Sequence, residues 1–278
     1  MDHAPDQPAA PARTYLFVPG DRPDRFDKAL ASDADRVILD LEDAVAPAAK
    51  DAARAQVEAR LRATPAAGRG RWVVRINDPA TPWFEADLRM LEDAGAVAVM
   101  LPRAEQPASV ARLREACPTI DVLALIETAR GLLEAQALAE APGVSRLVFG
   151  TVDFALDLDL SGDPLGLDAA ASRLAWVSRA AGLAAPVAGV TTEIAEPAPL
   201  LADWARARAH GFGAKLCIHP TQVAAVHEAL RPTPAQIDWA RRVMAATQGQ
   251  GGAVQVDGRM VDRPVVERAR LLLARAPG

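Results

Sequence analysis

Acidic side chains recur in this sequence at the ends of short apolar runs. Asp40 and Glu42 close one such run, Glu127 and Asp153 follow two others, and Arg75 ends a fourth. The alternation of a strand places Asp40 and Glu42 on the same face. If the runs are neighbouring strands, four carboxylates converge with one guanidinium, and they raise one another's pKa unless a cation neutralises them. The pattern therefore predicts an acidic site that holds a cation.

Glu127 and Asp153 are the expected ligands of that cation. Two carboxylates completed by water and substrate oxygens are the usual arrangement for Mg²⁺. The four histidines contain no HExxH pair for zinc, and there is no GxSxG motif for a nucleophilic serine. Each acid also has a structural interpretation, since Asp40 or Asp153 is a suitable helix N-cap and Glu127 has a nearby arginine for an ion pair.

The elements that would carry these residues alternate between strands and helices. Helix-like segments with three- and four-residue apolar spacing separate the apolar runs, and no GxGxxG follows any run. Eight strands alternating with helices predict a (β/α)8 TIM barrel, whose functional groups lie at the carboxyl ends of the strands. The eight predicted strands are Tyr15 to Val18, Val37 to Leu41, Trp72 to Ile76, Val97 to Leu101, Val122 to Ile126, Leu147 to Phe149, Pro186 to Val190 and Leu216 to Ile218.

The chain divides into three expected parts: a disordered tail over residues 1–13, the barrel over 14–230 and a C-terminal extension over 231–278. Thr233 and Gln236 read as a capping box that starts a helix ending near Thr247. A glycine-rich loop over 248–252, a hairpin over 253–261 and a helix over 264–274 follow. This extension is too small to form a core of its own, so we expect it to pack on the barrel or on a neighbouring subunit.

The composition excludes several classes of protein. The 278 residues are 50% hydrophobic and 24% charged, with a net charge of -5, so nucleic acid is not an expected partner. No apolar stretch is long enough to span a membrane. The first residues are acidic and rich in proline and alanine, unlike a secretory signal. Two isolated cysteines, Cys117 and Cys217, indicate a reducing cytoplasm rather than a disulfide framework.

Seven segments together resemble the HpcH/HpaI aldolase and citrate lyase superfamily, specifically its citrate lyase beta-subunit-like branch. They are 14–26 (TYLFVPGDRPDRF), 37–45 (VILDLEDAV), 75–77 (RIN), 101–103 (LPR), 126–131 (IETARG), 149–154 (FGTVDF) and 215–220 (KLCIHP). The resemblance implies a Mg²⁺-dependent TIM barrel, commonly a homotrimer or a dimer of trimers. It further implies that the protein makes or breaks carbon–carbon bonds in CoA or acyl-carrier thioesters.

The resemblance also implies roles for individual residues. Glu127 and Asp153 would bind the metal, with Glu127 also near the substrate, and Arg75 would hold the substrate carboxylate. Asp40 and Glu42 would order metal-bound water and Arg75. The residues expected near the substrate and its thioester are Phe17, Arg22, Lys28, Pro102 and Arg103.

Asp262 is the expected general acid for the enolate that carbon–carbon cleavage leaves behind. Residues 260–265 resemble the segment that malyl-CoA and citramalyl-CoA lyases donate from an adjacent subunit. This resemblance implies an active site shared between chains. An aspartate two residues before a proline is also what a helix N-cap looks like, so both interpretations stay open.

Four functions follow from this pattern. The leading one is an oxo-acid lyase that cleaves citryl-CoA, citramalyl-CoA or malyl-CoA to acetyl-CoA and a 2-oxo acid. The segment 187–194 differs from the corresponding stretch of malyl-CoA lyases, which disfavours glyoxylate-derived substrates. The alternatives are a thioesterase or malate-synthase-like activity, a citrate lyase beta subunit that depends on an acyl carrier, and a non-catalytic acyl-CoA-binding barrel.

Overall fold

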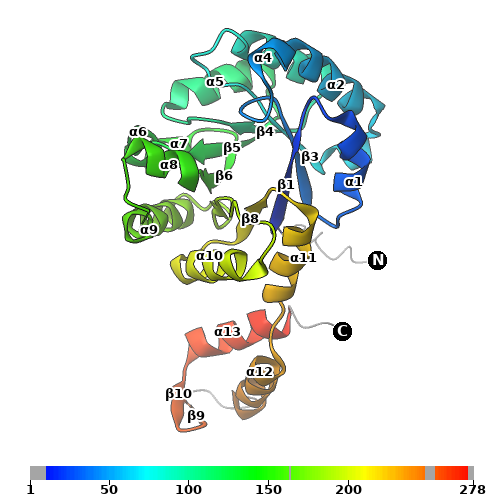
Figure 1. Cartoon of the computed structure of the whole chain (residues 1–278). Coiled ribbons are helices and arrows are strands. Elements are labelled where there is room, and N and C mark those ends of the chain that lie inside the picture. The colour runs from blue at the N-terminus through cyan, green and yellow to red at the C-terminus, as the bar shows by residue number, and fades with distance from the viewer. Residues whose placement is uncertain (1–10, 163, 248–253, 275–278) are drawn as a thin grey trace, which may run out of the picture. The chain divides into compact units, whose positions relative to one another are not determined.

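The computed structural model describes residues 11–162, 164–247 and 254–274, and within them the chain forms two compact units, residues 1–226 and 227–278. In the first unit, eight parallel strands close into a barrel in the order β1 to β8 (Figure 1). This confirms the predicted (β/α)8 architecture. The strands are β1 (Thr14–Pro19), β2 (Arg36–Asp40), β3 (Trp72–Arg75), β4 (Ala98–Leu101), β5 (Asp121–Ile126), β6 (Val144–Phe149), β7 (Val187–Ala188) and β8 (Ala214–Cys217).

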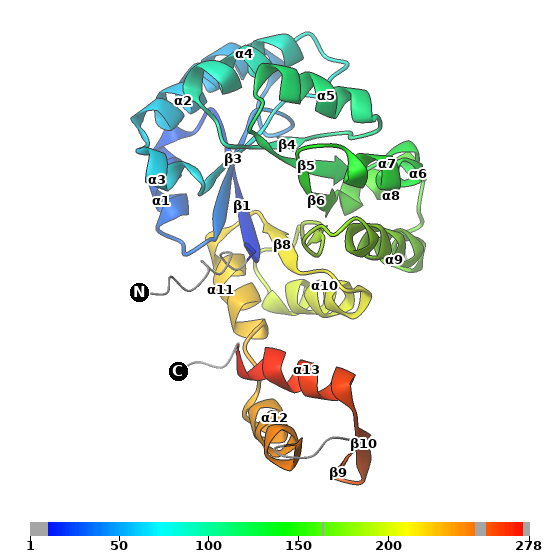
Figure 2. The ribbon, with the colours of Figure 1, turned by 180° about the vertical axis from the view of Figure 1, so that it is seen from behind.

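Helices surround the barrel, and the view from behind shows α2, α4 and α5 following one another around its outside (Figure 2). Short 3-10 turns at Pro23–Arg25 and Pro47–Ala49 lead directly into the helices that begin at Phe26 and Lys50. The helices of this unit are α1 (Phe26–Leu30), α2 (Lys50–Ala63), α3 (Ala66–Arg69), α4 (Phe84–Ala94), α5 (Pro107–Ala116), α6 (Ala129–Leu133), α7 (Ala135–Glu140), α8 (Thr151–Asp157), α9 (Leu165–Ala180) and α10 (Pro197–His210). The helix α11 (Pro220–Ala229) follows β8 and continues into the second unit.

The interior of the barrel is filled by one apolar side chain or two from each strand. Alternate residues of a strand face opposite sides, so these side chains point inward while their neighbours face the helices. The strand residues of this core are Tyr15, Ile38, Val73, Ala98, Met100, Leu123, Leu125, Val148, Val187, Ala214 and Leu216. The packed interior leaves chemistry to the loops at the ends of the strands.

Two predicted elements differ from the structure. The seventh strand was expected over Pro186 to Val190 but pairs only at Val187 and Ala188. Gly189 has no side chain to pack against the neighbouring strands, which weakens a strand at that point. The helix expected between Gly131 and Ala139 is two helices, α6 and α7, because Glu134 leaves helical geometry between them.

The second unit contains α12 (Pro234–Thr247), a hairpin of β9 (Val254–Val256) and β10 (Arg259–Val261), and α13 (Arg263–Leu273). The predicted capping box is present: Gln236 N–H donates to Thr233 Oγ1 and Thr233 N–H donates to Gln236 Oε1. The expectation that this segment forms no core of its own is wrong. A small core is built from Ala240, Val243, Val256, Val261 and Ala269. Small residues bring the two helices and the hairpin close enough to exclude water.

Within the described ranges, no helix has the length and apolar character needed to cross a bilayer. Cys117 and Cys217 are both buried free thiols. The predicted loop over 248–252 and most of the predicted tail over 1–13 lie outside the described residues.

Candidate active site

The predicted site residues of the barrel gather at the carboxyl ends of β2 to β6. Asp40 and Arg75 are the last residues of β2 and β3, and Arg103 lies just beyond β4. Glu127 directly follows β5, and Asp153 lies in the first turn of α8, after β6. Strand ends that meet at one face of the barrel thus bring together residues more than a hundred positions apart in sequence.

Asp40 and Arg75 form the buried ion pair of this site. They are direct neighbours in the parallel register of β2 and β3. Arg75 Nε donates to Asp40 Oδ1 at 2.8 Å and Nη2 donates to Oδ2 at 2.6 Å. Burial lowers the pKa of Arg75, but the charge and hydrogen bonds of Asp40 outweigh it and raise this pKa overall. Arg75 is therefore a fixed cation, and its bidentate geometry sets the plane of the guanidinium.

The remaining guanidinium nitrogen of Arg75 faces further carboxylates. Nη1 lies 2.9 Å from Glu42 Oε2 and 3.6 Å from Asp43 Oδ2. Burial raises the pKa of Glu42, although the charge of Arg75 lowers it, and Glu127 and Asp43 raise it further. Arg75 Cζ also lies 4.9 Å from the ring centre of Phe17, on β1. The mouth of the barrel consequently holds more carboxylates than Arg75 alone can neutralise.

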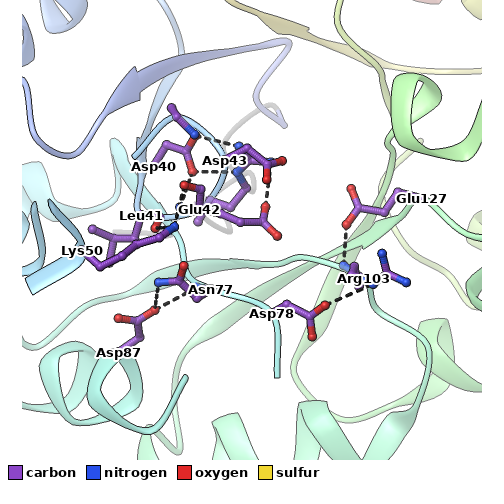
Figure 3. A network of polar contacts seen from close by, with 12 residues as sticks. Asp40, Leu41, Glu42, Asp43, Lys50, Asn77, Asp78, Asp87, Arg103 and Glu127 are labelled. Atoms are coloured by element: carbon purple, nitrogen blue, oxygen red, sulfur yellow. Dashed lines mark hydrogen bonds and ion pairs between the residues drawn. The ribbon is translucent and has the colours of Figure 1, made fainter. Parts of the chain in front are cut away.

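Lys50 is a site residue that the sequence interpretation missed. Its Nζ donates to the carbonyl oxygens of Leu41 and Glu42, at 2.7 Å each (Figure 3). The same nitrogen lies 5.2 Å from the ring centre of Trp83. Burial lowers the pKa of Lys50, whereas the charges of Asp40 and other acids raise it. Lys50 therefore fixes the loop that carries Glu42. The scarcity of lysine was a signal in the sequence that could have drawn attention to Lys50, because the chain has only three lysines.

The backbone of Arg103 positions Glu127. Arg103 has φ +42°, a left-handed conformation that is rare outside glycine, and its N–H donates to Glu127 Oε1 at 2.7 Å. The Arg103 side chain points to Asp78, with Nε 3.1 Å from Oδ2 (Figure 3). A strained backbone at a loop of this kind is typical of functional sites, where the surrounding structure enforces it.

Glu127 is a buried carboxylate with an unusual proton affinity. Burial raises its pKa to about 7; the hydrogen bond from Arg103 lowers it, and the charge of Asp153 raises it again. The side chain is 4% exposed. A carboxylate with this pKa changes its charge near neutral pH, so a neighbouring cation would strongly favour its ionised form.

Glu127 and Asp153 line the same cavity of about 410 Å³, together with Glu42, Asp43 and Lys50. Its other lining residues are Val45, Pro47, Asn77, Asp78, Thr81, Trp83 and Arg103. Among the described residues, no group of three or more acidic, histidine or cysteine side chains is arranged as a metal site. Two carboxylate ligands with room for water and substrate oxygens nevertheless fit Mg²⁺, which retains several such ligands.

Gly150 makes room for Glu127. A Cβ atom at Gly150 would lie 2.7 Å from Glu127 Cβ and 2.9 Å from Glu127 Oε2. Both distances are shorter than real carbon contacts, so any side chain at this position would displace the carboxylate. The glycine between β6 and α8 therefore has a steric role in the site.

The other predicted substrate-binding residues have different surroundings. Phe17 is half-buried and contacts Arg75, and Pro102 is buried beside Arg103. Arg22 and Lys28 are exposed, and the Arg22 guanidinium pairs with Asp24 at 3.0 Å. Neither exposed cation lines the cavity. Both could meet only the parts of a ligand that extend beyond it.

Asp262 lies in the second unit, as the N-cap of α13. Its Oδ1 accepts a hydrogen bond from Val265 N–H at 3.4 Å. The capping role is therefore present. The expected role as general acid is compatible with it, because a capping carboxylate uses one oxygen and leaves the other.

The profile of the HpcH/HpaI aldolase/citrate lyase family matches residues 13–220. The chain is 40% identical over 268 residues to a citrate lyase subunit beta-like protein of Mycobacterium tuberculosis, covering 94% of each chain. It is 35% identical over 275 residues to a (3S)-malyl-CoA thioesterase of Cereibacter sphaeroides, covering 96% of this chain and 95% of that protein.

Among solved structures, the protein CitE from Mycobacterium tuberculosis in complex with magnesium, acetoacetate and coenzyme A has a TM-score of 0.85 and 38% identity. The match covers 95% of this chain and 98% of the other. With the closed barrel and the acidic cavity at its carboxyl face, these similarities show that the chain belongs to the HpcH/HpaI aldolase/citrate lyase family.

Proposed function

We propose that this protein is a Mg²⁺-dependent carbon–carbon lyase that cleaves a 3-hydroxyacyl-CoA to acetyl-CoA and a 2-oxo acid. The observation that carries the proposal is the pair Glu127 and Asp153 lining one cavity with the cationic Lys50 and Arg103. The similar CitE structure contains magnesium, acetoacetate and coenzyme A, which are a metal, an oxo acid and a thiol carrier. The candidate substrates are citryl-CoA, citramalyl-CoA and malyl-CoA.

Glu127 and Asp153 are the proposed Mg²⁺ ligands. When bound, the metal would act as a Lewis acid toward the oxygen that becomes the carbonyl of the oxo acid. The Arg103 N–H holds Glu127 Oε1, which leaves Glu127 Oε2 as the oxygen for the metal. The loop after β4, which contains Pro102 and Arg103, thus positions the Glu127 carboxylate.

Arg75 is the proposed partner of the substrate carboxylate. Asp40 occupies Nε and Nη2, so a substrate carboxylate would bind at Nη1, where it would compete with Glu42 and Asp43 for the two N–H groups of that nitrogen. Asp40 and Glu42 position the guanidinium, and Phe17 covers one of its faces. Arg22 and Lys28, both exposed, are the proposed contacts for the anionic end of the thioester.

The reaction also needs a proton donor. Cleavage breaks the bond between the hydroxyl-bearing carbon and the α-carbon of the thioester, and the hydroxyl proton passes to a water molecule as the carbonyl of the oxo acid forms. The electron pair of the broken bond stays on the α-carbon, which takes up a proton to give acetyl-CoA. We assign that proton to Asp262 of a neighbouring subunit in a homotrimer or hexamer. The two buried free thiols agree with a reducing cytoplasm as the location.

A thioesterase activity is the second candidate, because one similar protein is a (3S)-malyl-CoA thioesterase. Water in the same acidic cavity would attack the thioester carbonyl, and the products would be CoA and a hydroxy acid. The two reactions differ in what is released, so a single assay separates them.

The test is turnover of citryl-CoA, (S)-citramalyl-CoA and (S)-malyl-CoA with Mg²⁺ or with EDTA, following free thiol and oxo acid together. We expect one ester to yield oxo acid and acetyl-CoA only with Mg²⁺. Free thiol without oxo acid would establish the thioesterase instead. Turnover of an acyl-carrier thioester but of no CoA ester would identify a carrier-dependent beta subunit, and no turnover of any would favour a binding protein.

A further inference from the structure

Asn77 occupies a defined position between the cavity and the helix layer. It follows β3 by two residues, is 2% exposed and lines the cavity that contains Glu127. Its backbone N–H and its side-chain Nδ2 both donate to Asp87 Oδ2, at 2.8 and 2.7 Å. One carboxylate on α4 thus holds both the main chain and the side chain of Asn77.

Asp87 is itself held from the other side. It is 0% exposed, and its Oδ1 accepts a hydrogen bond from Arg54 Nε, on α2, at 2.7 Å. Arg54 also donates to Asp51 at 2.6 Å. A buried carboxylate needs such a partner. The row Arg54, Asp87, Asn77 therefore connects the outer helices to the cavity wall.

This row determines which end of the Asn77 amide faces the cavity. A carboxylate can only accept hydrogen bonds, so the NH₂ group of Asn77 must point to Asp87. The amide oxygen then points away from Asp87, as Figure 3 shows. Oδ1 is a neutral acceptor in a wall whose other polar side chains are mostly charged.

We propose that Asn77 Oδ1 accepts a hydrogen bond from a neutral N–H or O–H group of the thioester substrate, and that Asp87 and Arg54 are positioning residues which act through Asn77. The inference rests on the proposed function, because it concerns the ligand of the same cavity. The groups with this chemistry nearest to the reacting carbons of a 3-hydroxyacyl-CoA are the hydroxyl of the acyl part and the amides of the pantetheine arm. A 2-oxo acid has neither.

The charged neighbours explain why a neutral acceptor matters here. Glu42, Asp43 and Asp78 would attract cations, whereas Asn77 favours an uncharged donor. A side-chain amide whose orientation is already fixed also contributes more to binding affinity than one that must lose rotational freedom when the ligand binds. The expected contribution is that of one neutral hydrogen bond, roughly 3- to 10-fold in dissociation constant.

The experiment measures dissociation constants by calorimetry, in Mg²⁺, for three probes. Acetyl-CoA carries pantetheine amides but no hydroxyl on its acyl group, (S)-malate carries the hydroxyl of the acyl part but no pantetheine, and pyruvate carries neither. Asn77→Ala should raise the dissociation constant of acetyl-CoA or of (S)-malate by roughly 3- to 10-fold and leave that of pyruvate within about 2-fold of the wild-type value. The affected probe identifies the donor. The inference would be overturned if pyruvate binding weakened equally, or if the binding of neither acetyl-CoA nor (S)-malate weakened. It would also be overturned if neither acetyl-CoA nor (S)-malate bound the wild-type protein.

Asp87→Asn tests the positioning role. In this variant Arg54 would donate to the amide oxygen of the new side chain, so its NH₂ group would face Asn77. An NH₂ group needs an acceptor, so the Asn77 amide would turn its oxygen toward residue 87 and away from the cavity. We expect a loss similar to that of Asn77→Ala, with no further loss in the double variant. Additive losses would show that Asp87 acts only on the general structure. Asp168→Asn, which removes another arginine-bound carboxylate between α9 and α10, is the matched control and should change none of the constants.

Binding and turnover separate this inference from the proposed function. If the protein binds the probes with the expected pattern but cleaves no thioester, the lyase assignment fails and the assignment of Asn77 stands. If it cleaves a thioester and Asn77→Ala binds all three probes as tightly as the wild type, the lyase assignment stands and the assignment of Asn77 fails.

Discussion

Asp40 and Arg75 end neighbouring strands in register, and two nitrogens of the arginine donate to the two oxygens of the aspartate at 2.8 and 2.6 Å. Asp40 also accepts the N–H groups of Glu42 and Ala44, which shapes the loop after β2. One carboxylate therefore orients both the arginine and the loop that carries the next acid.

Asp40→Asn should be strongly destabilising. It removes the charge that holds two of the three guanidinium nitrogens and leaves only the Nη1 ion pairs with Glu42 and Asp43. Removing one partner of a buried ion pair typically costs about 3 to 5 kcal/mol. Denaturant unfolding of the variant gives the value. Asp168→Asn is again the control, since Asp168 also has a bidentate arginine, Arg206, but both side chains of that pair are partly exposed to solvent. A comparable loss in the two variants would argue against burial as the reason.

Gly150→Ala should weaken Mg²⁺ binding without a change of any polar group. The added methyl carbon would meet Glu127 Cβ and Oε2 and push the carboxylate from its position. We expect at least about a tenfold weaker Mg²⁺ affinity by calorimetry, equivalent to about 1.4 kcal/mol. Gly70→Ala is the matched control, because a Cβ there meets nothing within 4 Å and its φ of -62° suits alanine. Unchanged Mg²⁺ affinity in Gly150→Ala would remove Glu127 from the metal site.

The pKa of Glu127 predicts a pH-dependent stability. In the folded protein the value is about 7, against an ordinary 4.5, so between these values the folded state keeps a proton that the unfolded chain has lost. Stability therefore falls as pH rises from about 4.5 to about 7, and the cost is complete above that range. Glu127→Gln removes this cost. The metal-free variant should be more stable than the wild type at pH 8, by up to about 3 kcal/mol, and equal to it near pH 4.5.

Thermal unfolding at several pH values, in EDTA, measures this difference. Added Mg²⁺ should raise the melting temperature of the wild type at pH 8 and have little effect on Glu127→Gln. A stability difference that does not vary with pH would show that Glu127 titrates normally.

The two roles of Asp262 can be separated by Asp262→Ser. Serine is a good N-cap, so α13 should keep its stability, while a proton donor of suitable acidity is lost. We expect an unchanged melting temperature and a fall in kcat of at least about 100-fold, with little change in KM. Full activity in this variant would reduce Asp262 to its capping role.

Mixing two inactive variants tests whether the site is shared between chains. Asp262→Ser and Glu127→Gln subunits, unfolded and refolded together, should recover part of the activity, because some mixed interfaces combine an intact barrel with an intact Asp262. Refolding each variant alone is the control. No recovery in the mixture would place both residues in the same chain's site.

The sequence by itself determined the barrel and the family. Eight apolar runs with helical segments between them specify alternating strands and helices, since strand and helix periodicities are local properties of the chain. The acids Asp40, Glu127 and Asp153 were found because they lie at the ends of those runs or within four residues after them. The capping box at Thr233 and the hairpin from Val254 were also local signals, and the structure contains both.

Only the tertiary structure decided how these residues meet. The strand register puts Asp40 beside Arg75, and the left-handed backbone of Arg103 turns its N–H to Glu127. Lys50 and Asp87 lie on helices, and nothing in their own segments shows that they reach loops after β2 and β3. Such contacts depend on how helices pack against the barrel, and burial, which sets the pKa of Glu127, is likewise a property of the folded molecule alone.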